Sequence, residues 1–251
     1  MRSVRFERAG RESYGVLEGE TVRALSAAPW AGGLPEGPAV ALAEVRLLAP
    51  VVPTKIVAVG RNYRAHAAEM GQEVPKEPLL FIKPSSAVVG PGQPIVIPEV
   101  SKLVHHEAEL AAVIGRTLTR AGTAAEARQA IFGWTCLDDV TARDIQRTEG
   151  HFTRAKSFDT FCPIGPVVET AVDPLDLTVS CRVNGEQRQR GSTRDMVHDP
   201  YLLVAFVSQV MTLYPGDVVT TGTPEGVGPL RRGDWVEVEI SGIGILKNPV
   251  A

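Results

Sequence analysis

The sequence has few cysteines, few aromatic side chains and a small net charge. Only 3 of its 251 residues are cysteine, and none has CxxC spacing, which argues against a disulfide framework and a thiolate metal site and is typical of a reducing cytoplasm. A formal net charge of −3 provides no basic surface for nucleic acid or an anionic membrane. The longest apolar run, Tyr201 to Val207, is too short to span a bilayer, and the charged first twenty residues lack the apolar segment of a signal peptide. We therefore expect a cytoplasmic protein with no nucleic-acid or membrane partner.

Glycine and proline are plentiful, with 24 and 19 residues. They separate short apolar runs, a pattern typical of many short strands joined by turns. Because strands and helices do not alternate regularly, we predict a strand-dominated α+β fold and not a doubly wound one. The length fits one domain with a small appendage. We place the boundary near residue 50, between a small N-terminal β module (1–50) and the main domain (51–251).

Local patterns predict the individual elements. Residues 3–25 have the pattern of a small meander. The Asn184-Gly185 dipeptide indicates a hairpin, because both residues tolerate the positive φ of a type I′ turn. Asp199 followed by Pro200 is typical of a helix start. The predicted strands are 55–59, 79–82, 94–98, 177–183 and 235–240, and the predicted helices are 62–70, 123–131, 141–148 and 199–213.

Two glutamates separated by one residue, Glu107 and Glu109, lie within an apolar segment. In a strand their side chains would point to the same side, about 7 Å apart. In a helix they would point to nearly opposite sides, and the Ala, Glu and Leu content of the segment favours a solvated helix face. Asp138 and Asp139 follow another apolar run and either cap the next helix or join the glutamates. Three clustered carboxylates without cysteine would suit Mg²⁺, Mn²⁺ or Ca²⁺ and would repel one another without a cation.

Six segments, in order from about residue 55 to the end, resemble the fumarylacetoacetate hydrolase family. They are Val59-Gly60-Arg61-Asn62-Tyr63 with His66 and Glu69; Phe81-Ile82-Lys83-Pro84-Ser85; Glu107-Ala108-Glu109-Leu110; Asp139-Val140-Thr141-Ala142-Arg143-Asp144; Arg154-Ala155-Lys156-Ser157-Phe158-Asp159; and Thr220-Thr221-Gly222-Thr223-Pro224-Glu225-Gly226-Val227-Gly228. The resemblance implies mixed β-sheets rolled around one active site, a strand for Glu107 and Glu109, and a homodimer.

The resemblance also assigns roles to particular residues. It implies that Glu107, Glu109 and Asp139 bind Mg²⁺, with Mn²⁺ or Ca²⁺ as alternatives. It makes His66 and Glu69 a catalytic dyad on a lid and places Lys156 beside the metal, where it stabilises an oxyanion. Taken alone, the i, i+3 pair His66 and Glu69 is an ordinary surface pair and Lys156 an ordinary solvated charge. The substrate-binding residues by the same resemblance are Arg61, Arg143, Gln146 and Thr223.

Further residues near these motifs receive no catalytic role. Tyr63 and Lys83 are expected in the pocket wall or around the metal ligands. His198 and the His105-His106 pair depart from the family pattern. We interpret His198 and His105 as structural. Cys162 has no adjacent base, so we do not expect it to be a nucleophile.

A 2-oxo acid or its enol offers one carboxylate and one carbonyl oxygen to a single cation, which then acts as a Lewis acid on the developing enolate. The leading hypothesis is a C–C bond hydrolase of an acylpyruvate-type substrate. The alternatives are a 2-hydroxyhepta-2,4-diene-1,7-dioate isomerase or 5-oxopent-3-ene-1,2,5-tricarboxylate decarboxylase of aromatic catabolism, an enol–keto shift, and an oxaloacetate decarboxylase. A non-catalytic metal- or acid-binding protein is a rival from another class.

Overall fold

The computed structural model describes residues 1–251 and contains nineteen strands and five α-helices. The predicted strand-dominated α+β fold is confirmed. The N-terminal strands are β1 (Arg2–Arg8), β2 (Arg11–Glu18), β3 (Thr21–Leu25), β4 (Pro35–Ala41) and β5 (Arg46–Leu48). The remaining strands are β6 (Ile56–Gly60), β7 (Leu79–Lys83), β8 (Val88–Val89), β9 (Val104–His106), β10 (Ala108–Ile114), β11 (Ile131–Asp138), β12 (Thr141–Ala142), β13 (Cys162–Glu169), β14 (Thr178–Val183), β15 (Glu186–Ser192), β16 (Val218–Thr220), β17 (Gly228–Leu230), β18 (Trp235–Ile240) and β19 (Gly244–Pro249). The helices are α1 (Arg64–Glu69), α2 (Ala124–Ala130), α3 (Arg143–Glu149), α4 (Phe152–Lys156) and α5 (Pro200–Val210).

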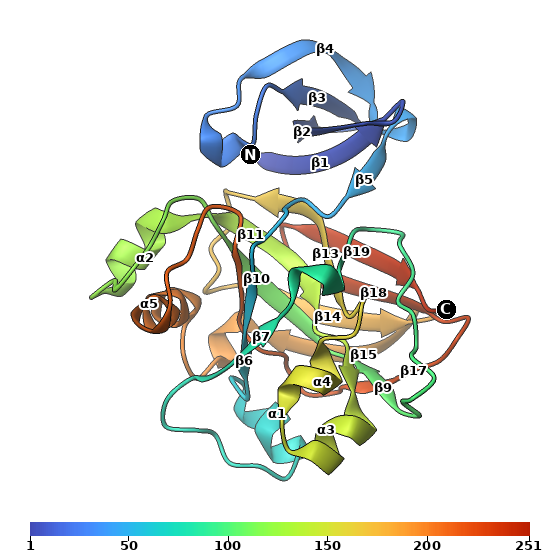
Figure 1. The fold of residues 1–251 in the computed structure, drawn as a ribbon, viewed down its shortest axis with the longest axis vertical. Coiled ribbons are helices and arrows are strands. Elements are labelled where there is room, and N and C mark those ends of the chain that lie inside the picture. The colour runs from blue at the N-terminus through green and yellow to red at the C-terminus, as the bar shows by residue number, and fades with distance from the viewer.

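Three sheets form the scaffold. The largest has the order β4-β3-β2-β1-β13-β11-β10-β16-β6-β7, with β5 paired to β1 and β8 paired to β13. The other two have the orders β12-β9-β17 and β15-β14-β18-β19. Strands β1 to β4 lie at one end of the molecule, and α1, α3 and α4 lie at the opposite end (Figure 1). The predicted division at residue 50 stays a prediction, and β1 pairs directly with β13 of the main body.

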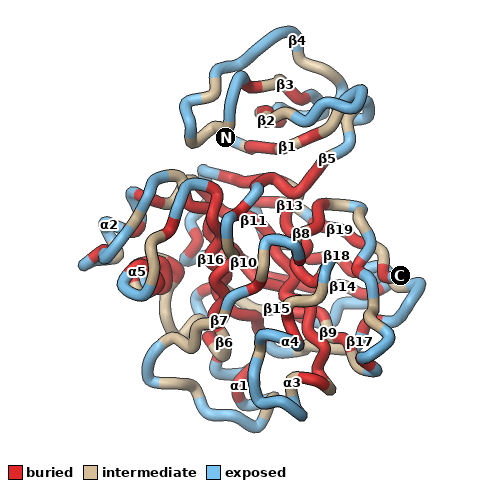
Figure 2. The backbone as a smooth tube through the Cα atoms, in the orientation of Figure 1, coloured by how far each residue is buried: buried red, intermediate tan, exposed pale blue.

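The core lies where the sheets face one another. Every residue of β10 is buried, and this strand lies between β11 and β16 in the large sheet. Buried backbone fills the centre of the main body, whereas much of α1 and the loop after it is exposed (Figure 2). A strand covered on both faces is apolar along its length and does not alternate, as the run from Leu110 to Ile114 shows. No helix is long and apolar enough to cross a membrane.

Side-chain caps explain two of the predicted helix starts. The Asp199 carboxylate accepts hydrogen bonds from the backbone N–H groups of Tyr201 and Leu202, and the Thr123 hydroxyl accepts one from Glu126. These bonds satisfy N–H groups that have no partner within the helix. Helix α5 is nevertheless shorter than predicted and ends at Val210, because Leu213 instead pairs with Leu118.

Two other sequence predictions are wrong in detail. Residues 94–98 form no strand and contribute only the isolated bridge of Ile95 with Val250. Prolines at both ends of the segment remove N–H donors from any ladder. The helix predicted from residue 141 starts at Arg143, because Thr141 and Ala142 pair with β9 as strand β12.

The Asp217 side chain fixes the start of the main body and is fully buried. Its carboxylate accepts hydrogen bonds from the N–H and hydroxyl of Thr54 at 3.0 and 2.6 Å and from the N–H of Tyr214 at 2.8 Å, and it pairs with the Lys55 ammonium. Burial alone would raise the pKa of Asp217, but the bonds from Lys55 and Thr54 outweigh it and lower that pKa.

Asp217→Ala is therefore expected to lower the free energy of unfolding by about 3 kcal/mol, because several partly buried donors and a cation lose their fully buried acceptor. Urea unfolding measures the change, and Asp159→Ala, at an exposed aspartate, is the control. Since the native pKa is lowered, the contribution is present at neutral pH and is lost as the pH falls through the native value. Equal unfolding free energies for the two variants would contradict this account.

Candidate active site

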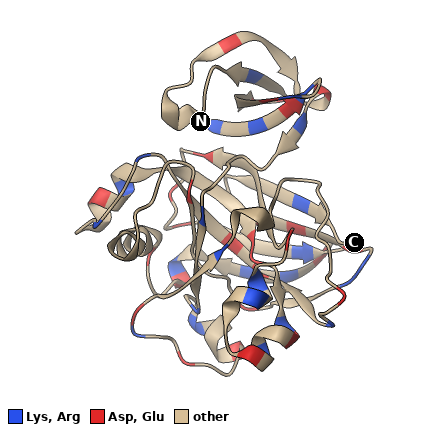
Figure 3. Cartoon of the chain, viewed as in Figure 1, with Lys and Arg blue, Asp and Glu red and all other residues tan.

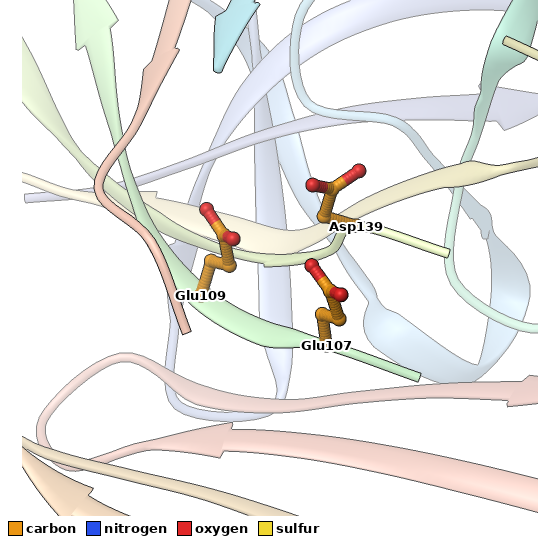
Figure 4. Close-up of side chains that lie close together, drawn as sticks. All are labelled: Glu107, Glu109 and Asp139. Atoms are coloured by element: carbon orange, nitrogen blue, oxygen red, sulfur yellow. The ribbon is translucent and has the colours of Figure 1, made fainter. Parts of the chain in front are cut away.

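The backbone of β10 and β11 brings three carboxylates together. Antiparallel pairing places Ala108 opposite Asp138, and the N–H of Asp139 donates to the carbonyl of Glu107 at 2.9 Å. Glu107 precedes β10 and Glu109 is its second residue, so the strand period of two puts both on one face. One oxygen from each of Glu107, Glu109 and Asp139 lies within 4.8 Å of the others. Their carboxylates face a common space (Figure 4).

The helix favoured by propensity for this segment is wrong, and the strand implied by the family resemblance is confirmed. Small alanines allow β10 to lie buried between two neighbouring strands, so tertiary pairing overrides helix propensity. Asp139 and not Asp138 joins the glutamates. Asp138 accepts a hydrogen bond from the N–H of Glu107 at 2.8 Å, and burial raises the pKa of Asp138 to about 7.

Three buried cations surround the carboxylate cluster. Lys156 Nζ donates to Glu107 at 2.8 Å and to Asp139 at 2.5 Å. Lys83 Nζ donates to the other oxygen of Asp139 at 2.7 Å, and Arg143 pairs with Glu107. Burial alone would raise the pKa of Glu107, but the charges of Lys156 and Arg143 outweigh it and hold that pKa well below its usual range. When Glu109 is also ionised, the three carboxylates and the three cations balance.

Glu109 has no cationic partner among these three. Its carboxylate accepts a hydrogen bond from the N–H of Gly222 at 2.9 Å. Burial, followed by the negative charge of Asp139, raises the pKa of Glu109 well above its usual range. Additional positive charge would therefore be stabilised most beside this residue. The donor set, three carboxylates without nitrogen or sulfur, fits a hard divalent cation such as Mg²⁺ or Mn²⁺.

Metal affinity is expected to rise with pH. Because the pKa of Glu109 is raised, a metal ion that binds at low pH must first displace its proton. The affinity for Mn²⁺ should therefore be several-fold higher at about pH 7.5 than at about pH 5.5. Titration followed by electron paramagnetic resonance measures it, and Glu225→Gln, at an exposed glutamate, is the control that should keep the wild-type dependence. An affinity independent of pH in the wild type would contradict the prediction.

The His66 and Glu69 pair lies on α1, close to the cluster. His66 Nδ1 is 3.4 Å from a carboxylate oxygen of Glu69, and both oxygens of Glu69 accept from the N–H of Gly226, at 3.1 and 3.2 Å. Glu69 is exposed at the rim, whereas His66 is 6% exposed. An ordinary surface pair would expose both residues. This arrangement instead lets Glu69 fix the orientation of a buried imidazole.

All ten predicted site residues line one pocket of about 850 Å³. Helices α3 and α4 supply lysine and arginine to this end of the molecule (Figure 3). Arg61 has the left-handed backbone angle φ of 58°, and its buried Nε has no hydrogen-bond partner. Strain of this kind in a non-glycine residue is concentrated at functional sites.

Some features of the pocket were not predicted from the sequence. Arg147, His151, Phe152 and residues 79–82 also line it. Arg147 could have been found, because it lies four residues after Arg143 and so on the same helix face. His151 and Phe152 lie at the start of α4 and residues 79–82 lie in β7, and their place in the pocket depends on long-range packing.

The Thr223 hydroxyl has no hydrogen-bond donor left for a substrate. It donates to the carbonyl of Ala108 at 2.8 Å and accepts from Gln189 at 2.7 Å. Its donor is therefore used within the fold, and the predicted contact of Thr223 with the substrate is left to its backbone N–H. Cys162 is buried, and burial raises its pKa to about 12, which agrees with the absence of a nucleophilic role.

Comparison with known proteins identifies the class. The model of the family described as "Fumarylacetoacetate (FAA) hydrolase C-terminal" matches residues 55–251, and that described as "Rv2993c-like, N-terminal" matches residues 1–50. The chain belongs to the fumarylacetoacetate hydrolase family, and the relatives with named activities are enzymes.

Three relatives with named activities are closely similar to the chain. The oxaloacetate tautomerase YcgM of Escherichia coli is 47% identical over 196 residues, which cover 75% of this chain and 89% of that protein. A structure of 5-carboxymethyl-2-hydroxymuconate delta-isomerase from Mycobacterium smegmatis is 44% identical, with a TM-score of 0.94 and coverage of 100% and 99%. A structure of 2-hydroxyhepta-2,4-diene-1,7-dioate isomerase from Mycobacterium marinum is 43% identical, with a TM-score of 0.93 and coverage of 100% and 98%.

Proposed function

We propose that this protein is a divalent-metal-dependent tautomerase or isomerase of 2-oxo dicarboxylic acids, with oxaloacetate as the first substrate to test. The observation that carries the proposal is the buried cluster of Glu107, Glu109 and Asp139 beside a buried His66 in one pocket. The names of three similar proteins, a tautomerase and two isomerases, support proton transfer as the reaction.

The charges of the site favour a dianionic substrate. With Glu109 ionised, as a metal ligand must be, the three carboxylates are balanced by Lys83, Lys156 and Arg143. A divalent ion would therefore leave an excess of two positive charges in a buried site, where uncompensated charge is costly. A 2-oxo dicarboxylate supplies the two negative charges that restore neutrality.

In this proposal each residue has a defined task. Glu107, Glu109 and Asp139 would hold the metal ion, which when bound polarises the carbonyl oxygen of the 2-oxo acid as a Lewis acid. His66 takes the proton from the carbon next to the carbonyl or returns it there, and Glu69 orients its ring. Lys156, whose ammonium group donates to Glu107, Asp139 and Thr141, would stabilise the enolate oxygen through its positive charge. The substrate oxygens are held by Arg61, Arg143, Gln146 and the N–H of Thr223.

Isomerisation or tautomerisation now replaces hydrolysis as the leading hypothesis for the reaction. The sequence favoured C–C bond hydrolysis, whereas the names of the similar proteins favour the isomerase and tautomerase alternative. Tautomerisation uses the same metal ligands and the same histidine, but it breaks no carbon–carbon bond. Mg²⁺ as the resident ion, a role in aromatic catabolism, the cytoplasmic location and the homodimer all stay predictions.

The reaction is tested by following the ultraviolet absorbance of enol-oxaloacetate with Mg²⁺ or Mn²⁺ and, as a control, with a chelator. We expect metal-dependent acceleration of the enol-to-keto change with no change in mass. Pyruvate and carbon dioxide would instead indicate decarboxylation, and two acids from an acylpyruvate would indicate hydrolysis. Metal binding without turnover of any of these substrates would support the non-catalytic alternative and contradict the proposal.

A further inference from the structure

Strand β15 contributes no residue to the pocket, yet one of its side chains reaches the backbone of the site. β15 is an edge strand of the four-stranded sheet, and most of its residues are exposed or partly exposed. Gln189 is the exception and is 1% exposed. Burying an amide without hydrogen bonds is costly in free energy, so we expect the Gln189 amide to have hydrogen-bond partners inside the protein.

The Gln189 amide uses its full hydrogen-bonding capacity. Its oxygen lies 3.0 Å from the N–H of Ala108 and 3.0 Å from Nδ1 of His106. Its nitrogen donates to the Thr223 hydroxyl at 2.7 Å and to the carbonyl of Pro224 at 2.8 Å. The backbone donor of Ala108 and the backbone acceptor of Pro224 allow only this orientation of the amide. His106 must then carry its proton on Nδ1.

These bonds replace a missing stretch of β-ladder beside the carboxylates. β16 pairs with β10 only as far as Thr220 opposite Ala111. Beyond that point Thr221 donates to the carbonyl of Leu110, and Thr223 and Gln189 bond the carbonyl and N–H of Ala108. Ala108 is the residue between Glu107 and Glu109. Its peptide groups therefore set the spacing and direction of the two carboxylates.

The hydrogen bonds of Gln189 to Thr223 and Pro224 also hold the turn that follows β16 against β15. Space between this turn and β15 is minimal: a Cβ on Gly226 would lie 2.2 Å from the carbonyl oxygen of Arg188, and one on Gly191 would lie 2.6 Å from Pro224. The turn supplies the N–H of Gly222 to Glu109 and the N–H of Gly226 to Glu69. Both the carboxylate cluster and the dyad are thus tied to β15.

We propose that Gln189 is a positioning residue that holds the Ala108 backbone and the 222–228 turn in register, and so aligns the metal-binding carboxylates with the His66–Glu69 pair. The inference deepens the proposed function and rests on it. Residues that orient metal ligands without touching the ion typically change metal affinity or activity by about 10- to 100-fold when replaced.

Gln189→Met tests the proposal, since methionine keeps the side-chain length but makes none of the four hydrogen bonds. The matched control is Gln187→Met, at an exposed glutamine of the same strand. We expect Gln189→Met to lower Mn²⁺ affinity and kcat/KM each by about 10-fold or more at a temperature far below its Tm. We expect Gln187→Met to match the wild type. Gln189→Glu, which keeps the acceptor facing Ala108 but loses the donors to Thr223 and Pro224, should shift both quantities in the same direction.

The outcomes separate the two proposals. A wild type that binds no Mn²⁺ and accelerates no tautomerisation would contradict the proposed function. An active wild type together with folded Gln189 variants of unchanged Mn²⁺ affinity and kcat/KM would overturn the positioning role. Variants that lose only Tm, or that fail to fold at all, would assign Gln189 to the fold alone and would overturn it as well.

Discussion

Glu109→Gln is expected to reduce the affinity for a divalent metal by at least about 100-fold and to abolish metal-dependent turnover. Replacing a residue that only orients a metal ligand typically costs about 10- to 100-fold in affinity, and Glu109→Gln replaces a proposed ligand itself. Glutamine keeps the shape of the side chain and an oxygen for the N–H of Gly222. The neutral amide, however, removes the one cluster carboxylate that has no bonded cation. Isothermal titration with Mn²⁺ and the enol-oxaloacetate assay measure the two effects.

In contrast to its metal affinity, the thermal stability of the metal-free Glu109→Gln variant should not fall below that of the wild type. Burial and Asp139 raise the pKa of Glu109, so its ionised form is unfavourable in the metal-free fold. Tm in the presence of a chelator is therefore expected to be unchanged or higher than that of the wild type. Glu225→Gln, at an exposed glutamate of the nearby turn, is the control for both measurements. Wild-type Mn²⁺ affinity in Glu109→Gln would remove this residue from the metal site.

His66→Ala is expected to lower kcat by about 100- to 10,000-fold, the range for loss of a general acid or base. Its effect on Mn²⁺ affinity should stay within about twofold, because the imidazole makes no hydrogen bond to the cluster carboxylates and bonds only Glu69. The expected signature is a loss of turnover with intact metal binding. Stopped-flow assays and Mn²⁺ titration of the same preparation measure both.

Arg64→Ala is the matched control, since Arg64 is exposed on the same helix. It should retain the kcat and the Mn²⁺ affinity of the wild type. If His66→Ala turned over substrate as fast as Arg64→Ala, the dyad would have no part in the reaction. If it lost metal binding in proportion to activity, His66 would belong to the metal site and not to proton transfer.

Local sequence signals predicted those parts of the fold that depend on neighbouring residues. Asp199 before Pro200 marked the start of α5, and Asn184-Gly185 marked the hairpin of β14 and β15. Such features are readable because a cap or a turn is set by a few adjacent side chains. The end of α5 was missed because pairing of Leu213 with the distant Leu118 decides it. The strand predicted at 94–98 failed for a local reason, the prolines at both of its ends.

The candidate site shows the same limit. Propensity alone favoured a helix for Glu107 and Glu109, and only the resemblance to a family indicated the strand that places them together. Gln189 could not be singled out from the sequence, because its importance comes from four partners 34 to 83 residues away. Residue types suggested the chemistry of the site, whereas long-range packing determines which residues support it.

The central claim is that Glu107, Glu109 and Asp139 together bind one divalent ion. A crystal structure of the Mn²⁺-soaked protein, with anomalous diffraction recorded at the manganese edge, tests it most directly. The account predicts one strong anomalous peak per chain within coordination distance of an oxygen from each of the three carboxylates, at about 2.0–2.3 Å. A peak bound elsewhere, or none at this cluster at saturating Mn²⁺, would contradict it.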